Sequence, residues 1–583
     1  MRTGILLLVL LRTLPLAAAP DLIVYNAKVT SFNQQGITAF AVKDGRFTEL
    51  SSSAQELLRQ KDSATQLIDA GGRLVIPGLN DSHLHVVRGG RFYNLETRWE
   101  GISSLKQALS LVAQQAKRTP KDQWVRVIGG WTPEQFQEKR LPTLAELDKA
   151  APNTPVFILH LYSGAILNSA GLQALGITSQ SQAPIGSYYE KDAEGKLTGV
   201  LVADPNPQLL YQSIAALPGL STEQQLNSSL QFFQALLGYG VTSVVDAGGG
   251  GHLFPQNYQA STRLAVEGKL PIRIASYLFP QQPGDELNQF ARWMANYQQD
   301  QNLDARHPRG YTIAGGGELL AWSASDYENF RSPRPELKPG FELELQNIVR
   351  MHLLMRWPFR IHATYDETID KMLDVLEKIN KDQPLNKVRW AFDHAETVSD
   401  RNLERIHKLG GGIAVQARMA FAGEDFLARY GKSKTQNTAP VKKMLELGIP
   451  VGLGTDGTRV ASFNPWVTYY WLVSGKTLGG TVLYAAEQRL DRLTALRLFT
   501  LGSAWFSGDE QQKGAIAPGM LADFSILNQD ILQVEEPLLL QTRSELTVVD
   551  GQVEYASKAF PAFIRPRLKA EPLWSPVNLV PSE

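Results

Sequence analysis

Four histidines and one aspartate have the residue types and the spacing expected of a metal-binding site. His83 and His85 are separated by a single residue, and His362, His394 and Asp456 follow much later in the chain. Side chains at positions i and i+2 of a β-strand share a face, so the first two imidazoles could reach one ion. Imidazole and carboxylate groups suit a divalent metal such as Zn²⁺, which lowers the pKa of a bound water to about 7 and so provides a nucleophile at neutral pH.

Each of these residues lies near the end of a short β-type segment. Eight such segments alternate with longer ones that have helical apolar spacing, which predicts parallel strands joined by crossover helices. Eight such units predict a (β/α)₈ barrel, whose site residues lie at the carboxyl ends of the strands. The predicted strands are RLVIPGLNDSHLH, GVTSVVDAG, PIRIASYLF, RGYTIAGGG, FRIHATYD, VRWAFDHAE, GGIAVQARM and VGLGTDG.

The His-x-His pair alone is a weak indication of metal binding, because strand histidines often satisfy hydrogen bonds in a core. The common position of all five residues at predicted strand ends makes metal ligation the favoured interpretation. Five further histidines lack this position, and we expect them to be surface or packing residues, although the first of them could also reach a substrate: His160, His252, His307, His352 and His407.

Short β-rich segments near both ends predict a small β domain built from the two termini. VKDGRFTEL and VVDGQVEYA each place an Asp-Gly turn between β-type residues, which is a strong signal for a hairpin. Two unrelated hairpins are the alternative. The predicted fold class is therefore α/β, a TIM barrel with a small β-sandwich domain formed from both termini and a long insertion after the first barrel strand.

These patterns also predict the domain boundaries. We expect a signal peptide at 1–19, the first part of the β-sandwich at 20–75, the barrel at 76–508 with its insertion at about 95–235, the second part of the sandwich at 509–560 and a C-terminal tail at 561–583.

The N-terminal sequence and the composition indicate where the protein is located and which kinds of partner it can have. Arg2, a leucine-rich run and small residues up to Ala19 are typical of a secretory signal peptide, with a retained hydrophobic helix as the alternative. The chain has no cysteine, which excludes disulfides and thiolate metal ligands. Lys plus Arg and Asp plus Glu both number 58, so no broad field attracts nucleic acid. We expect a periplasmic or secreted protein that acts on a small molecule, without stable membrane insertion after signal cleavage. A homodimer is an open alternative to the monomer.

The motifs, in their order, resemble those of the amidohydrolase superfamily, in particular amidohydrolase family 3, a branch of metal-dependent hydrolases and exoenzyme-regulatory-like proteins. VIPGLNDSHLH resembles the first-strand motif of this family, RIHATYD the strand-five motif, FDHAE the strand-six motif and GLGTDG the strand-eight motif. LTALRLFTLGSAWFSGDEQQKGAIAPGMLADFSIL is similar to the C-terminal signature of the family. The resemblance covers about residues 21–555.

This resemblance implies a metal-dependent hydrolase. It implies that His83, His85, His362 and His394 lie around one or two divalent metals, with zinc the expected ion. Asp456 would bind the more buried metal and take a proton from the attacking water, with His394 as its catalytic partner. The expected reaction is hydrolysis of a C–N bond in an amide-like, N-acyl or cyclic amide compound by metal-activated water.

One departure from the family concerns the fourth strand. Binuclear members carry a lysine there, whose carboxylated side chain bridges two metals, and the position that corresponds to this lysine here is Thr312, with Gly316 and Gly317 in place of the family's Asp-Gly. A threonine cannot form this bridge, so we expect one metal. Glu318 is then either a loop carboxylate that faces solvent, which is the favoured interpretation, or an alternative ligand or acid at the substrate site.

Three aromatic residues are candidates for the substrate pocket. Trp131 and Tyr162 lie in the insertion, although large aromatic residues there more often belong to a core. Tyr365 follows the strand-five histidine and is expected to narrow the pocket. Two other functions are open: a catalytically weakened barrel that serves as a binding protein, and a hydrolase of an ester, lactone or phosphoester.

Overall fold

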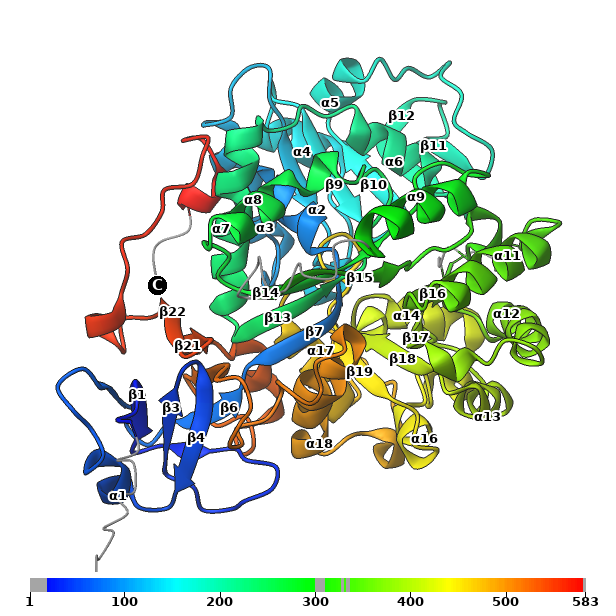
Figure 1. The fold of residues 1–583 in the computed structure, drawn as a ribbon. Helices are drawn as coiled ribbons and strands as arrows, with labels where there is room; N and C mark the ends of the chain where they lie inside the picture. The colour runs from blue at the N-terminus through cyan, green and yellow to red at the C-terminus, as the bar shows by residue number, and fades with distance from the viewer. Residues whose placement is uncertain (1–17, 299–309, 327–329, 332–335, 580–583) are drawn as a thin grey trace, which may run out of the picture.

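Eight parallel strands form the centre of the computed structural model, which describes residues 18–298, 310–326, 330–331 and 336–579 (Figure 1). The strands are neighbours in the order β19-β18-β17-β16-β15-β14-β13-β7. Every strand predicted from the sequence is present, and their bounds are β7 Leu79–Leu84, β13 Val241–Asp246, β14 Arg273–Leu278, β15 Tyr311–Gly316, β16 Phe359–Ala363, β17 Trp390–His394, β18 Gly412–Gln416 and β19 Val451–Gly454.

The first and last strands approach each other and nearly close the barrel. The amide of Asp456 donates to the carbonyl of His83 at 2.8 Å, and the amide of His85 donates to Gly457 at 3.1 Å. Gly454 permits this approach, because a Cβ at this position would lie 2.6 Å from the backbone nitrogen of His83. Residues almost 400 positions apart in the chain thereby meet at one end of the barrel.

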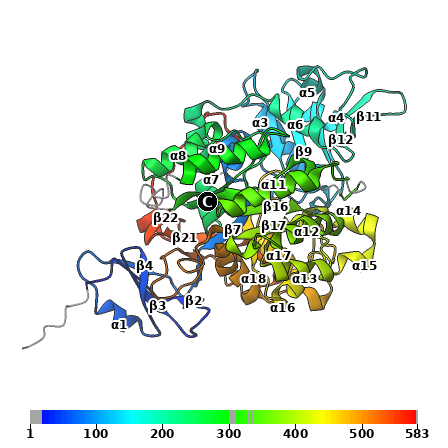
Figure 2. The same cartoon turned by 45° about the vertical axis from the view of Figure 1, so that its right-hand side comes forward.

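Helices surround the strands (Figure 2). Ile361 and Phe392 of the strands belong to one buried core with Leu373 and Ile406 of the covering helices. Segments with helical apolar spacing, such as STEQQLNSSLQFFQALLGYG and DETIDKMLDVLEKINK, form helices as expected. The covering helices are α2 Val86–Phe92, α7 Thr222–Leu237, α8 Gln259–Val266, α9 Glu286–Gln298, α11 Phe341–Leu354, α12 Asp366–Asn380, α13 Asp400–Leu409, α14 Arg418–Tyr430, α16 Val441–Glu446, α17 Pro465–Ser474 and α18 Arg492–Arg497.

The insertion between α2 and α7 contains its own five-stranded sheet, in the order β11-β12-β10-β9-β8. Figure 1 shows it as the cyan unit above the barrel. Its strands are β8 Val125–Ile128, β9 Val156–His160, β10 Gly164–Leu167, β11 Ser187–Lys191 and β12 Leu197–Ala203, and its helices are α3 Leu105–Ala116, α4 Leu144–Ala150, α5 Ser169–Ala174 and α6 Gln208–Ala215. The insertion therefore has a core of its own and presents a rigid wall to the barrel.

Strands from both termini form two sheets that pack face to face, which confirms the predicted fold class. Phe40 of the first sheet lies 5.0 Å from Phe524 of the second, measured between ring centroids. Asp44 and Asp550 occupy the two predicted Asp-Gly turns and have positive φ, as such turns require. The first sheet contains β1 Leu22–Tyr25, β3 Ala39–Lys43, β4 Arg46–Ser51 and β5 Gln66–Asp69, and the second contains β2 Lys28–Val29, β6 Leu74–Pro77, β20 Phe524–Leu527, β21 Ser544–Val549 and β22 Gln552–Ala556.

A buried ion pair joins the barrel to this β-sandwich. Arg273 of β14 donates to both carboxylate oxygens of Asp523, at 2.7 and 3.1 Å, and to Asp550 at 3.2 Å. Burial alone would raise the pKa of Asp523, but Arg273 outweighs burial and holds this pKa below its usual range. The pair therefore keeps its charges across neutral pH.

Replacement of Asp523 by Asn is expected to lower the free energy of unfolding by about 3 kcal/mol, because Arg273 would remain as a poorly compensated buried charge. Urea denaturation at pH 7 measures this loss, and the metal content should not change. Because the folded pKa lies below the unfolded value of about 3.9, this stabilisation is complete above that value and is lost as pH falls through the folded pKa. Equal unfolding free energies of the variant and the wild type at pH 7 would contradict the prediction.

The C-terminal segment after β22 lies along α7 and α3 (Figure 1, red). Asn227 and Gln231 of α7 donate to the carbonyls of Lys569 and Leu568, at 2.9 and 2.6 Å. Gln115 of α3 donates to the carbonyl of Trp574 at 2.9 Å. The segment thus bridges a barrel helix and a helix of the insertion.

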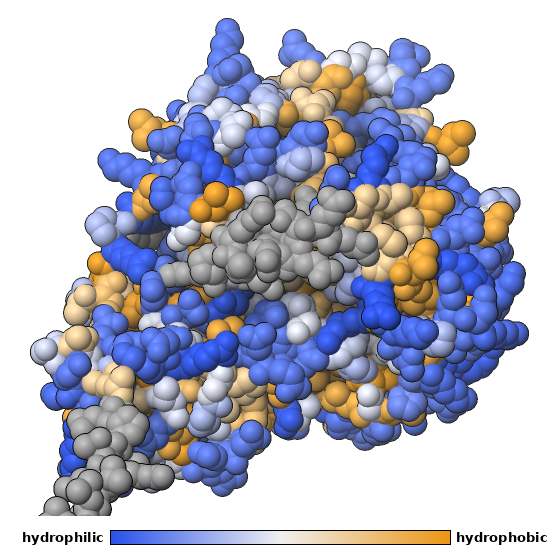
Figure 3. All heavy atoms as spheres, in the orientation of Figure 1, coloured by the Kyte–Doolittle hydropathy of each residue, from blue (hydrophilic) through white to orange (hydrophobic). Residues whose placement is uncertain are grey.

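The surface in Figure 3 is mostly hydrophilic, with apolar side chains in small groups. Among the helices of the described part of the chain, none combines the length and apolar character needed to cross a membrane. The predicted signal peptide, residues 1–19, lies almost wholly outside the described residues.

Candidate metal centre

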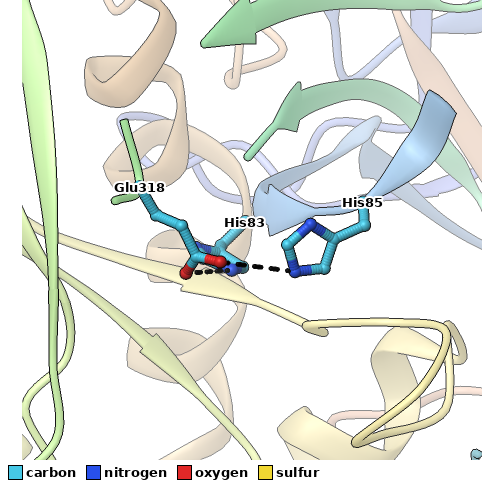
Figure 4. Close-up of side chains that lie close together, drawn as sticks. All are labelled: His83, His85 and Glu318. Atoms are coloured by element: carbon cyan, nitrogen blue, oxygen red, sulfur yellow. Dashed lines mark ion pairs between the residues drawn. The ribbon is translucent and has the colours of Figure 1, made fainter. Parts of the chain in front are cut away.

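The four histidines and Asp456 meet at the carboxyl ends of the barrel strands, around the carboxylate of Glu318. The Oε2 atom of Glu318 lies 3.5 Å from His83 Nε2, 3.2 Å from His362 Nδ1 and 3.3 Å from His394 Nε2. Its Oε1 atom lies 3.7 Å from His85 Nε2. Figure 4 shows this carboxylate reaching across both histidines of the His-x-His pair. Glu318 is thus a shared neighbour of two histidine pairs.

Asp456 lies beside the first of these pairs. Its Oδ1 atom is 3.1 Å from His85 Nε2 and 3.5 Å from His83 Nε2, and its Oδ2 atom is 3.9 Å from His394 Nδ1. Three overlapping sets of possible ligands result: His83, His85 and Glu318; His83, His394 and Asp456; and Glu318, His362 and His394. The structure therefore brings together all five residues predicted as ligands and adds Glu318.

Buried partners fix the orientation of His83. Its Nδ1 atom lies 3.0 Å from Asp393 Oδ1, and Asp393 in turn accepts a hydrogen bond from Arg360 Nε at 3.1 Å. Arg360 also donates to the carbonyl of Ser82 at 2.6 Å. A carboxylate that accepts the Nδ1 proton directs Nε2 at the site, which is the orientation that metal-bound histidines require.

His85 and His362 are oriented in the same way by backbone and side-chain acceptors. His85 Nδ1 lies 2.8 Å from the carbonyl oxygen of Gly248, which leaves Nε2 for the site. His362 Nε2 lies 3.1 Å from the carbonyl oxygen and 3.4 Å from the carboxylate of Asp326, which leaves Nδ1 for the site. Asp326 was not predicted as a site residue, because it belongs to no recognisable motif.

The glycine run at the end of β15 explains how Glu318 reaches the centre. A Cβ on Gly316 would lie 2.4 Å from His352 Nε2, and a Cβ on Gly317 would lie 2.3 Å from the carbonyl oxygen of Arg360. Gly317 also has φ of +118°, which residues with a side chain rarely adopt. The backbone therefore passes against its neighbours and turns Glu318 inwards, where it is only 8% exposed. The interpretation of Glu318 as a solvent-facing carboxylate is corrected.

Thr312 lies at the other end of the same strand. It is the second residue of β15 and pairs with Ala275 of β14, whereas Glu318 comes directly after the last glycines and enters the centre. The hydroxyl of Thr312 is therefore not the group that this strand contributes to the site. The expectation of a single metal rested on Thr312 as the residue at the position of the bridging lysine.

Arg418 is a further member of the site that sequence reasoning missed. Its Nη2 atom donates to Asp456 Oδ2 at 2.6 Å and lies 3.4 Å from His394 Nδ1. Burial alone would raise the pKa of Asp456, but His83, His85 and Arg418 outweigh it and hold this pKa well below its usual range. Asp456 is therefore an ionised carboxylate at neutral pH. Arg418 lies near the end of the seventh predicted strand segment, GGIAVQARM, and this place at a strand end was the available signal.

The centre has the properties expected of a cation site. Burial would lower the pKa of His83, but Asp393, Asp456 and Glu318 outweigh it and raise this pKa to about 10. Glu318 likewise raises the pKa of His362 to about 10 against the effect of burial. His83 Nε2 is buried without a hydrogen-bond partner among the described residues. Carboxylates that attract positive charge and an unpaired imidazole nitrogen both fit a divalent metal.

A cavity of about 620 Å³ opens beside this centre, which is within the usual range of ligand pockets. Glu318, His362, His394 and Asp456 line one side of it, and Tyr162 of the insertion lines another. The predicted substrate-site residues Glu318 and Tyr162 thus border the cavity, together with His85.

Two predicted pocket residues lie elsewhere. Trp131 is fully buried within the insertion, where it packs against Trp99 and Phe136 and donates to the carbonyl of Leu159 at 3.0 Å. Tyr365 is 3% exposed and belongs to the core around the barrel. The assignment of these two residues to the substrate pocket is corrected, because the ring of Trp131 is buried in a core of the insertion and the ring of Tyr365 in the core around the barrel.

The remaining histidines differ in their positions. His252 lines the cavity and is 3% exposed, so it is not a surface residue. His352 is fully buried and stacks on Trp357, which confirms a packing role. His160 is buried beside Ser163, and the lining of the cavity does not include it. His407 is exposed, and His307 lies outside the described residues.

A parallel barrel with a buried cluster of imidazoles and carboxylates at its carboxyl end defines the class of metal-dependent hydrolases. Comparison with known families identifies the chain within this class. Residues 66–555 match the model of the amidohydrolase family, and the chain belongs to that family.

Individual relatives are distant but extend over nearly the whole chain. The chain is 24% identical to N-substituted formamide deformylase of Arthrobacter pascens, over 92% of this chain and 98% of the relative. It is 25% identical to the putative amidohydrolase YtcJ of Bacillus subtilis (strain 168), over 86% of this chain and 93% of the relative. An uncharacterized metal-dependent hydrolase from Pyrococcus horikoshii OT3 has a similar fold, with a TM-score of 0.61 and 23% identity over 88% of this chain and 99% of that chain.

Proposed function

We propose that this protein is a metal-dependent hydrolase that cleaves the C–N bond of a small amide-like compound. The observation that carries the proposal is the cluster of four imidazoles and two carboxylates beside a cavity of about 620 Å³. Family membership supports hydrolysis in general. The C–N bond is supported by the relative named N-substituted formamide deformylase, since an N-substituted formamide is an amide.

We further propose that the centre holds two divalent ions, with zinc as the expected metal for nitrogen and oxygen ligands. His83, His85 and Asp456 would hold the first ion, and His362 and His394 the second. Glu318 would be shared by both, because its two oxygens face different histidines. This differs from the single ion expected from Thr312, because Glu318 would take the role of the absent lysine.

When bound, the metal would supply a water of lowered pKa and stabilise negative charge on the carbonyl oxygen of the substrate. Asp456 faces the cavity and remains ionised at neutral pH, so it can accept a proton from that water and pass it to the leaving nitrogen. Arg418 fixes the carboxylate of Asp456 through its hydrogen bond at 2.6 Å. His83 is held in place by Asp393, so its nitrogen need not reorient during the reaction.

Metal analysis combined with a simple amide substrate tests this proposal. Purified protein loaded with zinc should contain about two ions per chain, as in two-metal hydrolases. It should hydrolyse N-formylbenzylamine, lose this activity on chelation and regain it with zinc. Failure to bind metal under loading conditions would overturn the proposal, as would hydrolysis that survives complete metal removal. Cleavage of benzyl formate without cleavage of the amide would instead favour an esterase.

Removal of the metal should also lower the melting temperature. The described ligands come from five strand ends between His83 and Asp456, so a bound ion stabilises only the folded chain. Differential scanning calorimetry with and without chelator measures this shift. An unchanged melting temperature in chelator, with the ion confirmed as absent, would contradict a metal held by strands from all around the barrel.

We also propose that the protein is exported, to the periplasm or beyond the cell, after cleavage near Ala19. The leucine-rich run and the small residues that follow it support this. N-terminal sequencing of protein recovered outside the cytoplasm would test the cleavage site.

A further inference from the structure

Two arginines line the cavity next to the proposed metal centre in addition to Arg418. Arg88 lies on α2, three residues after the ligand His85, and Arg459 lies three residues after the ligand Asp456. Arg88 is 3% exposed and Arg459 is 9% exposed. Guanidinium groups as buried as these are costly unless they are paired.

Neither arginine has a carboxylate partner. Among the described residues, no acidic oxygen lies within 4.0 Å of either guanidinium, and the Nε and Nη2 atoms of Arg88 have no hydrogen-bond partner. Asp246 is close enough to interact electrostatically with Arg88, but burial raises the pKa of Asp246 to about 7 and so reduces its charge. Burial and the charge of Arg88 both lower the pKa of Arg459. Glu96 also interacts electrostatically with both arginines, but burial raises its pKa as well. This wall of the cavity therefore has two guanidinium groups with no carboxylate of a described residue in direct contact.

The guanidinium of Arg88 lies close to the ring of the ligand His85. A Cβ on Gly249 would lie 3.3 Å from His85 Nδ1, 3.4 Å from Arg88 Nη1 and 3.6 Å from His252 Cε1. The Nδ1 edge of His85, opposite the Nε2 atom that faces the metal centre, and Arg88 therefore border the same small region, which the glycine leaves free of side chain. A substrate that reaches the metals with its carbonyl would bring its neighbouring atoms to Arg88.

Residues of the insertion hold Arg459 in its position. Tyr162 interacts electrostatically with Arg459, and the guanidinium carbon of Arg459 lies 6.0 Å from the ring centroid of Tyr211. Much of the remaining lining is apolar and includes Phe279 and Trp322. Such surroundings strengthen the attraction of an arginine for an anion, because little water competes.

We propose that Arg88 and Arg459 bind a carboxylate of the substrate, so that the amides cleaved by this protein are acidic compounds of the N-acyl amino acid type. This inference rests on the proposed function. Guanidinium groups form strong hydrogen bonds to carboxylates, and Arg88 presents its Nη1 atom to the region that Gly249 leaves open. The apolar lining would receive the side chain of the amino acid.

A matched pair of substrates tests the inference. N-formylphenylalanine and N-formylphenethylamine have the same amide and the same ring, and only the first has a carboxylate. We expect kcat/KM of the wild type to favour the acid by about 10- to 100-fold, which is the usual effect of one charged hydrogen-bonded contact. Arg88→Met should remove this preference by lowering kcat/KM for the acid alone, and Arg459→Met should lower the same quantity.

Arg91→Met is the matched control. Arg91 lies on the same helix and donates to Gln225, outside the lining of the cavity, so its replacement should leave both substrates unaffected. Melting temperature and zinc content would show that each variant is folded and loaded. Equal rates on the two substrates, or equal losses on both in Arg88→Met, would overturn the inference while leaving amide hydrolysis in place.

Equilibrium binding separates this inference from the proposed function. If neither amide is hydrolysed, the proposed function fails, and calorimetry with hydrocinnamate and 3-phenylpropanamide still decides the anion site. We expect zinc-loaded wild type to bind the acid more tightly than the amide, and Arg88→Met to bind the acid about 10-fold more weakly. Hydrocinnamate that binds equally to wild type and Arg88→Met would be held by the metals alone and would overturn the inference.

Discussion

Asp456→Asn is expected to lower kcat for amide hydrolysis by about 10³-fold, within the range of general acid–base catalysis. Asparagine has almost the same shape but cannot take a proton from the attacking water. The hydrogen bond from Arg418 can be kept by the amide oxygen, so the site should not collapse. Steady-state kinetics with zinc content measured on the same sample checks the result.

Asp246→Asn is the matched control for this variant. Asp246 is also a fully buried aspartate at the end of a barrel strand, but it belongs to none of the ligand sets among the described residues. Its replacement should leave kcat within a few-fold of the wild-type value. Retention of wild-type kcat by Asp456→Asn would show that another group accepts the proton.

Glu318→Gln is expected to lower the zinc content from about two ions per chain to about one, and to reduce activity by at least about 10²-fold. A neutral amide binds zinc weakly and cannot bridge two ions. The ion held by His362 and His394 should be lost, because Glu318 is the anionic ligand nearest to both histidines. Elemental analysis after dialysis gives the stoichiometry.

Glu396→Gln serves as the control for Glu318. Glu396 is 2% exposed and lies 3.5 Å from Arg418, but it is in none of the described ligand sets. Its replacement should leave both ions in place. Two ions retained by Glu318→Gln would mean that the two sites do not depend on this carboxylate, and the shared-ligand arrangement would have to be abandoned.

The barrel could be predicted from the sequence because each of its strands and helices corresponds to a short local pattern of residues. Each strand is a short apolar run, and each is followed by a segment with helical spacing, such as α12. Once the strands are parallel, the topology places His83, His362, His394 and Asp456 at the same end without any knowledge of side-chain contacts. The two Asp-Gly hairpins were predictable for a similar reason, since the turn determines the pairing.

The sequence offered Glu318 both as a solvent-facing residue and as a residue of the site, and could not decide between them, because its position depends on contacts between distant segments. Its direction is set by the close passage of Gly316 and Gly317 against His352 and Arg360, which lie 35 or more residues away in the chain. Sequence comparison with the expected lysine pointed instead to Thr312. A glycine run that replaces a motif can thus indicate close backbone packing rather than loss of a function.

The arginines of the cavity escaped prediction for a different reason. The chain contains 58 lysines and arginines, and most arginines lie on surfaces. Only burial without a partner distinguishes Arg88 from these, and burial is a property of the folded chain. Trp131 shows the converse, because its large ring suggested a pocket wall whereas the sheet of the insertion encloses it.

The C-terminal segment has a consequence for how substrate range could change in evolution. By joining Gln115 of the insertion to Asn227 of the barrel, it fixes the separation between the wall that contributes Tyr162 and the barrel end where the chemistry takes place. Substitutions along this segment could therefore widen or narrow the entrance for different acyl or amino groups while every catalytic side chain stays unaltered. Substrate selectivity could then change while the catalytic residues stay the same, and new substrates could be gained by substitutions remote from the metals.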